Sequence, residues 1–131
     1  MVDVANVMGA RADGWWRDRA GAALRLCREV QGLAARETGP SASPAGPAAA
    51  WVLVLEGRAR DAADSAAETA VPPVRVVSAP ASGDDTIVEV VAEVIASGEN
   101  CLVVTADREL RRRCEALAAA VVGPGWLLRQ L

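Results

Sequence analysis

Residues 51–55 are Trp-Val-Leu-Val-Leu, an uninterrupted apolar run of the length of a strand. A strand with one face in water alternates apolar and polar residues, whereas a continuous run indicates a strand that is covered on both faces. Residues 101–104, Cys-Leu-Val-Val, have the same character. Buried strands of this kind belong to parallel sheets that carry helices on either side. The run therefore predicts an α/β fold.

Segments of helical periodicity separate the predicted strands. Residues 82–98 are rich in β-branched side chains, but only a helix separates Glu89 and Glu93 from the apolar Ile87 and Val91. We expect strands at residues 1–7, 51–55, 74–77, 101–104 and 121–122. We expect helices at residues 15–36, 57–69, 82–98, 107–119 and 126–131. The helix at residues 15–36 follows a loop at residues 9–14 and is expected to be capped by Asp13. This alternation predicts one domain over residues 1–131, a doubly wound, mostly parallel sheet in three α/β/α layers, with residues 38–48 as a flexible connector.

The composition excludes several classes of enzyme. All 14 basic residues are arginine, and the chain has no lysine and no histidine, so a P-loop, a Schiff base and a serine–histidine or cysteine–histidine couple are excluded. Cys27, Cys101 and Cys114 lack metal-site spacing, so we expect small core residues. Without an apolar stretch of about 20 residues or a signal peptide, a cytoplasmic protein with no membrane partner is predicted. Catalysis would have to use carboxylates, hydroxyls, arginines, thiols or a metal.

Polar residues lie at the ends of three predicted strands. They are Asp3 and Asn6 after the first, Asp84 and Asp85 after the third, and Thr105 and Asp107 after the fourth. The carboxyl ends of parallel strands meet at one edge of a sheet, so these side chains are expected to converge. Hard oxygen ligands without histidine or thiolate favour Mg²⁺ or Mn²⁺. The alternative for Asp84, Asp85 and Asp107 is helix capping, whereas Asp3, inside a predicted strand, caps nothing obvious.

Three sequence blocks resemble a known family. Residues 2–7 (Val-Asp-Val-Ala-Asn-Val), 83–89 (Gly-Asp-Asp-Thr-Ile-Val-Glu) and 103–110 (Val-Val-Thr-Ala-Asp-Arg-Glu-Leu) are similar to the signature blocks of NYN-domain proteins, and most of all to the bacterial YacP-like branch. The resemblance implies a PIN-like, Rossmann-like fold and a metal-dependent ribonuclease. It matches Asp3 to the metal-binding aspartate of the first strand and Asn6 to its companion, and it matches Asp84, Asp85 and Asp107 to the remaining acids.

We therefore expect an endoribonuclease that hydrolyses RNA phosphodiester bonds with Mg²⁺ or Mn²⁺. Asp3, Asp85 and Asp107 are the predicted metal ligands, and Asp84 is predicted to bind the metal or to orient the attacking water. Asn6 and Thr105 are expected to hold the carboxylates in place. Glu89 is either a further ligand or the closing residue of a capping box.

An acidic protein needs local positive charge to bind RNA, and the formal net charge here is −3. We expect Arg108, Arg11 and Arg17 to contact the RNA. A ribosome-associated RNA is one candidate substrate. Of Trp15 and Trp16, one is expected to enter the core and the other to be free to stack on a base.

Two other classes compete with the nuclease hypothesis. A phosphatase or phospho-acceptor domain also places aspartates at parallel-strand ends, but it generally needs a lysine. A catalytically weak or inactive RNA-binding or interaction module on the same fold is the main alternative. It is favoured by Val4, where relatives have a smaller residue, and by the short run before Asp3.

Overall fold

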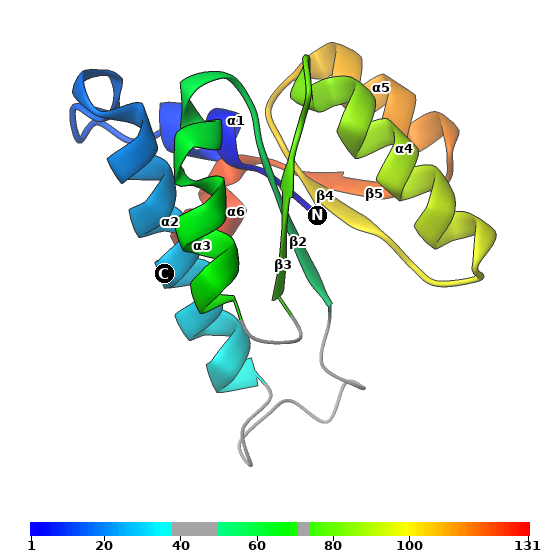
Figure 1. The fold of residues 1–131 in the computed structure, drawn as a ribbon. Helices are drawn as coiled ribbons and strands as arrows, with labels where there is room; N and C mark the ends of the chain where they lie inside the picture. Colours follow the sequence, from blue (N-terminus) through cyan, green and yellow to red (C-terminus); the bar gives the residue numbers. More distant parts are fainter. Residues whose placement is uncertain (38–49, 71–73) are drawn as a thin grey trace.

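The apolar run 51–55 forms the strand β2 (Trp51–Leu55) inside an all-parallel sheet of the computed structural model (Figure 1). The structure describes residues 1–37, 50–70 and 74–131, so the predicted connector at residues 38–48 lies outside the described residues. In the described part of the chain the other strands are β1 (Val2–Asp3), β3 (Val74–Ser78), β4 (Leu102–Val104) and β5 (Ala120–Val122).

The order of the strands in the sheet is β3-β2-β1-β4-β5. Val2 of β1 lies opposite Leu53 of β2 on one side and opposite Val104 of β4 on the other. The chain thus builds outward from β1 in one direction, through β2 to β3, and then in the other, through β4 to β5. Because the strand order reverses at β1, the carboxyl ends of β1 and β4 border the crevice where open α/β sheets bind ligands.

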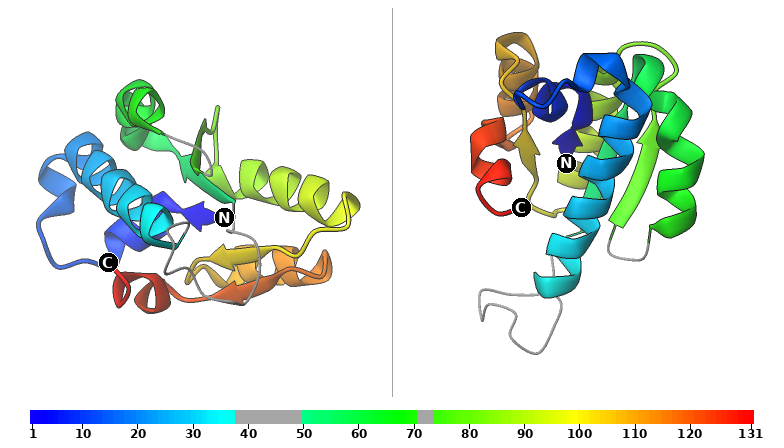
Figure 2. Two further views of the ribbon diagram at one scale, coloured as in Figure 1. Left: turned by 90° about the horizontal axis from the view of Figure 1, so that it is seen from below. Right: turned by 90° about the vertical axis from the view of Figure 1, so that its left-hand side faces the viewer.

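Helices cover both faces of the sheet, as the view from below in Figure 2 shows. One face carries the helices α1 (Val4–Gly9), α2 (Arg19–Glu37), α3 (Ala63–Thr69) and α6 (Pro124–Leu128), with the 3-10 helices η1 (Trp15–Arg17) and η2 (Gly57–Ala62). The other face carries α4 (Gly83–Ala96) and α5 (Arg108–Ala116). The three-layer α/β/α arrangement predicted from the sequence is confirmed.

Two buried clusters flank the sheet because successive side chains of a strand point to opposite faces. Leu53 and Leu55 join the cluster under α1 and α2, while Val54 joins the cluster under α4 and α5. Val103 and Val104 of β4 divide in the same way. A strand that supplies side chains to two cores must be apolar throughout, which is why β2 contains no alternation.

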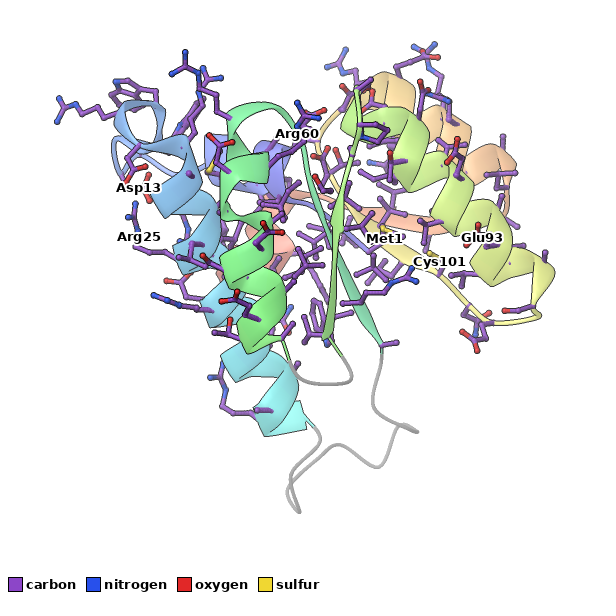
Figure 3. All side chains as sticks on the ribbon, in the orientation of Figure 1. Met1, Asp13, Arg25, Arg60, Glu93 and Cys101 are labelled. Atoms are coloured by element: carbon purple, nitrogen blue, oxygen red, sulfur yellow. The ribbon has the colours of Figure 1, made fainter. Side chains whose placement is uncertain are left out.

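Several predicted boundaries are wrong. The predicted strand at residues 1–7 ends at Asp3, and Val4 already begins α1. Asp13 does not cap the following helix: it lies in the exposed loop before η1 (Figure 3), and Asp18 Oδ1 instead accepts a hydrogen bond from the Gly21 N–H at 2.9 Å at the start of α2. Asp18 is the better cap because it immediately precedes the helix.

The end of α5 also differs from the prediction of a helix to residue 119. The helix stops at Ala116, and Ala118 adopts a left-handed conformation with φ of 70°. In that conformation its N–H bonds the Glu115 carbonyl and the Ala119 N–H bonds the Cys114 carbonyl, which satisfies the last carbonyls of the helix. The chain can then turn directly into β5.

Other expectations are met in part. Cys27 and Cys114 are buried in the two clusters, but Cys101 is only partly buried at the entrance to β4; all three thiols are free. The predicted helix at residues 57–69 is divided between η2 and α3, and Arg60 (labelled in Figure 3) ties η2 to the loop after β3 by donating to the Ala79 and Pro80 carbonyls. Every helix in the described part of the chain is too short or too polar to cross a membrane.

Candidate functional site

Asp3 is the last residue of β1 and the N-cap of α1. Its Oδ1 accepts a hydrogen bond from the Asn6 N–H at 3.3 Å. The expectation that Asp3 caps nothing is therefore wrong. The sequence does indicate the helix that Asp3 caps. Val4, Val7 and Met8 are spaced as on one helix face, and all three are buried. The short apolar run at residues 1–7 predicted a strand, but its second half has the spacing of this helix face.

The second oxygen of Asp3 joins the carboxyl ends of β1 and β4. Thr105, which follows β4, donates its hydroxyl hydrogen to Asp3 Oδ2 at 2.9 Å, and both side chains are almost completely buried. Thr105 Oγ1 in turn accepts from the Asp107 N–H at 3.1 Å. Asn6 Oδ1 accepts from the Ala106 N–H at 2.7 Å. Thr105 thus holds the Asp3 carboxylate, while the Asn6 side chain instead holds the loop after β4 against the first turn of α1.

Asp107 enters this network as the N-cap of α5, and its Oδ1 accepts from the Leu110 N–H at 2.9 Å. Capping and a functional role are compatible here, because one oxygen of a carboxylate suffices for the cap and the other keeps its lone pairs.

The structure adds an acid that the sequence analysis did not consider. Glu56 directly follows β2, and its Oε2 accepts from the Gly83 N–H at the start of α4 at 2.5 Å. A Cβ at position 83 would lie 2.9 Å from that oxygen, so the glycine permits this close approach. The rule applied to the other strands, a polar residue at the carboxyl end of a buried strand, would have identified Glu56.

The carboxylates of four residues repel one another in pairs. They are Asp3, Glu56, Asp84 and Asp107, and we call them the acidic cluster. Burial is the main reason that the pKa of Asp3 is raised from 3.8 to about 6; the charges of Glu56 and Asp84 raise it further, against the hydrogen bonds from Thr105 and Asn6. The pKa of Asp84 is raised by burial and by the charges of Asp107, Glu56 and the adjacent Asp85, while Arg113 opposes the shift.

Asp85, predicted to be a metal ligand with Asp3 and Asp107, adds its charge to the neighbouring Asp84 but is turned toward Arg113, and we do not count it in the acidic cluster. Its side chain is 69% exposed, and its Oδ1 accepts from Arg113 at 2.9 Å. Adjacent residues on a helix point about 100° apart, so only one of the pair can face the sheet edge. Asp84 precedes the buried Ile87 and Val91 by three and seven residues and therefore shares their face.

The other predicted acid of α4, Glu89, does not join the cluster either. It is exposed and makes no hydrogen bond within the described ranges. The helix is capped by Ser82, which accepts from the Asp84 N–H at 3.2 Å.

The predicted RNA-contacting arginines have different surroundings. Arg11 is paired with Glu29, whereas Arg108 and Arg17 form no ion pair with any residue that the structure describes. Neighbouring arginines on α5 are paired: Arg111 with Glu115, Arg112 with Glu109 and Arg113 with Asp85. Within the described residues, Arg108 is thus the arginine of α5 that has no ion-pair partner.

Trp15 and Trp16 divide as expected. Trp15 packs partly buried against the first core cluster, while Trp16 is 57% exposed. Their rings meet edge to face with centroids 6.0 Å apart. Arg17 lies over the Trp16 ring, 5.9 Å from its centroid.

The acidic cluster suits a divalent cation in charge and in ligand type, but it is not a closed cage. Within the described residues, no three aspartate, glutamate or cysteine side chains are arranged to hold one ion together. Mg²⁺ commonly keeps several waters and is held by only one or two carboxylates, so it does not require such a cage. The lone-pair positions that remain on Asp84 and Asp107 fit that hydrated mode of binding.

Comparisons of this chain with protein-family models, with curated proteins and with solved structures found no match. The resemblance to NYN-domain proteins therefore remains a prediction from the three sequence blocks.

Proposed function

We propose that the chain is a metal-dependent endoribonuclease that hydrolyses RNA phosphodiester bonds at the carboxyl ends of β1, β2 and β4. One observation carries the proposal: at the point where the strand order reverses, the buried Asp3 carboxylate is held by Asn6 and Thr105 and is repelled by Glu56 and Asp84, while Asp84 is repelled by Asp107; burial, and then these charges, raise the pKa of Asp3 and Asp84. Like charges held together disfavour ionisation, and a bound cation would remove that repulsion. The sequence resemblance supports the same activity.

The residues of the site have distinct parts in this proposal. Asp3 is fixed by its bonds to Asn6 and Thr105, so its carboxylate is a rigid anchor. The Asp84 side chain makes no hydrogen bond with any described residue, and its raised pKa favours acceptance of a proton from an attacking water. Asp3, Glu56, Asp84 and Asp107 would hold Mg²⁺ or Mn²⁺ directly or through water. When bound, the cation supplies charge neutralisation at the scissile phosphate.

The neighbouring pair Asp84 and Asp85 offers a matched test. In a cleavage assay on labelled single-stranded RNA with Mg²⁺ or Mn²⁺, we expect Asp84→Asn to lower the rate by at least about 10- to 100-fold. Asp85→Asn removes the same charge one residue away, at an exposed position, and should leave the rate within about threefold, because exposed ion pairs contribute little. Equal effects of the two variants, or full activity in excess EDTA, would contradict the proposed mechanism.

Metal binding has its own readout. Mg²⁺ should raise the thermal midpoint of the wild type, because a ligand of the folded state stabilises it. Asp107→Asn should abolish that rise without weakening the helix, since asparagine caps α5 as well as aspartate does.

A second function, a non-catalytic RNA-binding module, is favoured by the lack of a three-carboxylate cage among the described residues. It predicts RNA binding without cleavage and no effect of Mg²⁺ on stability.

A further inference from the structure

Two neighbouring surface hollows lie beyond the end of β2, and one of them reaches the acidic cluster. The nearer, of about 340 Å³, includes Glu56 of the cluster together with Trp15, Arg19 and Arg58. The farther, of about 510 Å³, is lined by Trp16, Arg17, Asp18, Arg19, Arg58 and Asp61. Arg19 and Arg58 line both hollows, so the two are neighbours, one bordered by Glu56 and the other by Trp16. We call the two hollows together the Arg19–Arg58 channel.

Three arginines and three acids line the channel, and none of these arginines forms an ion pair with a described residue. Arg17, Arg19 and Arg58 have no carboxylate within ion-pair distance in the described part of the chain, unlike Arg11 and the paired arginines of α5. Of the three acids that line it, Glu56, Asp18 and Asp61, the first two already accept hydrogen bonds, from the Gly83 and Gly21 N–H groups. Unpaired guanidinium groups next to a carboxylate cluster suit a ligand that carries repeated negative charge.

Trp16 provides a second, independent feature of the channel. It is the exposed large apolar side chain of the described residues, so it contributes little to the core. Its ring is nevertheless held in place, edge to face against the partly buried Trp15 and beside the Arg17 guanidinium. A fixed aromatic ring beside arginines is the usual platform on which an unpaired base stacks.

We propose that the Arg19–Arg58 channel binds an unpaired polynucleotide strand, with a base on Trp16 and phosphates at Arg19 and Arg58, and so delivers the adjoining phosphodiester to Glu56 and the acidic cluster. The inference deepens the proposed function and rests on it for the position of the cut. A duplex fits poorly, because its bases are stacked on one another and leave no face for the tryptophan.

Binding is tested apart from cleavage, in EDTA, by the fluorescence anisotropy of a labelled 12-nucleotide oligouridine. We expect Trp16→Ala to weaken binding about 5- to 150-fold, and Trp16→Phe to restore most of it. Arg58→Ala should make the dependence of log affinity on log salt shallower by about 0.7, the value for one phosphate contact with a single strand. The control is Arg25→Ala, an exposed arginine of α2 outside the channel (Figure 3), which should bind as the wild type does. All four variants should keep the wild-type thermal midpoint within a few degrees.

The same measurement with a DNA 12-mer and with an RNA hairpin identifies the ligand. Tighter binding of both single strands than of the hairpin supports the proposal, and a preference for RNA over DNA would assign a role to the 2′-hydroxyl. Tighter binding of the hairpin, or unchanged binding by Trp16→Ala and Arg58→Ala, would overturn it.

The two proposals fail separately. If the variants weaken binding as expected but the wild type never cleaves with Mg²⁺ or Mn²⁺, the channel stands and the nuclease does not. If cleavage of the 12-mer proceeds equally well in Trp16→Ala and Arg58→Ala, the nuclease stands and the channel does not.

Discussion

Replacing Asp3 with asparagine should separate the contribution of this residue to function from its effect on stability. Burial and the charges of Glu56 and Asp84 raise the pKa of Asp3 from 3.8 to about 6. The folded chain therefore binds more protons than the unfolded chain between these pH values. Stability falls as pH rises through that window, and the loss is complete above the folded-state pKa. Two pKa units correspond to about 3 kcal/mol.

Asp3→Asn removes the titration but keeps an acceptor for the Asn6 N–H. The substitution has a local cost, because the amide then faces Thr105 and leaves the buried hydroxyl without its acceptor, which is worth about 1–2 kcal/mol. At pH 4, where Asp3 is largely protonated, the variant should be slightly less stable than the wild type. At pH 7.5 it should be more stable by about 1–2 kcal/mol, a rise in thermal midpoint of about 3–10 °C for a chain of this size.

The assay is urea unfolding followed by circular dichroism from pH 4 to pH 8. Asp13→Asn is the matched control, since Asp13 is exposed and makes no hydrogen bond with the described residues. Asp3→Asn should also lose RNA cleavage, so that the more stable protein is the inactive one. If the free energies of unfolding of the wild type and of Asp3→Asn differ by the same amount at every pH in this range, the raised pKa of Asp3 is refuted.

Three further substitutions test other features. Glu56→Gln keeps an acceptor for the Gly83 N–H but removes a charge, so it should lower the pKa of Asp3. In the same unfolding series, the loss of stability between pH 4 and pH 6 should then occur at lower pH. Gly83→Ala places a Cβ 2.9 Å from Glu56 Oε2 and should displace that carboxylate, with a change in thermal midpoint of only a few degrees but a loss of the stabilisation by Mg²⁺. Ala118→Gly relieves the left-handed backbone after α5 and should raise the free energy of unfolding by about 0.5–1 kcal/mol, measured by urea unfolding; a decrease would contradict the strain at φ of 70°.

The architecture was predictable because the strands of a doubly covered sheet are apolar throughout. The runs at residues 51–55 and 101–104 indicated burial on both faces, and the structure places their side chains in two clusters. The first strand was not predictable in this way. Two residues of strand are too short for any periodicity, and their extended conformation is imposed by pairing with β2 and β4.

The candidate site was predictable only in part. That Asp3, Asn6, Thr105 and Asp107 would meet followed from the parallel topology, and their hydrogen bonds confirm it. Asp84 and Asp85 were both predicted to belong to the site, and only the phase of α4 distinguishes them: Asp84 interacts with Asp107 and Glu56, whereas Asp85 is exposed and paired with Arg113. The partners of each carboxylate depend on distances of a few tenths of an ångström across separate loops, which sequence spacing does not contain.

The position of β1 between β2 and β4 determines when the acidic cluster comes into existence during synthesis. The hydrogen bond between Asp3 and Thr105 spans 102 residues of sequence. A ribosome must therefore release most of the domain before β1 acquires both neighbours, and a nascent chain that is interrupted earlier lacks the assembled site. By this ordering, the acidic cluster is assembled only when translation of residues 1–131 is nearly complete.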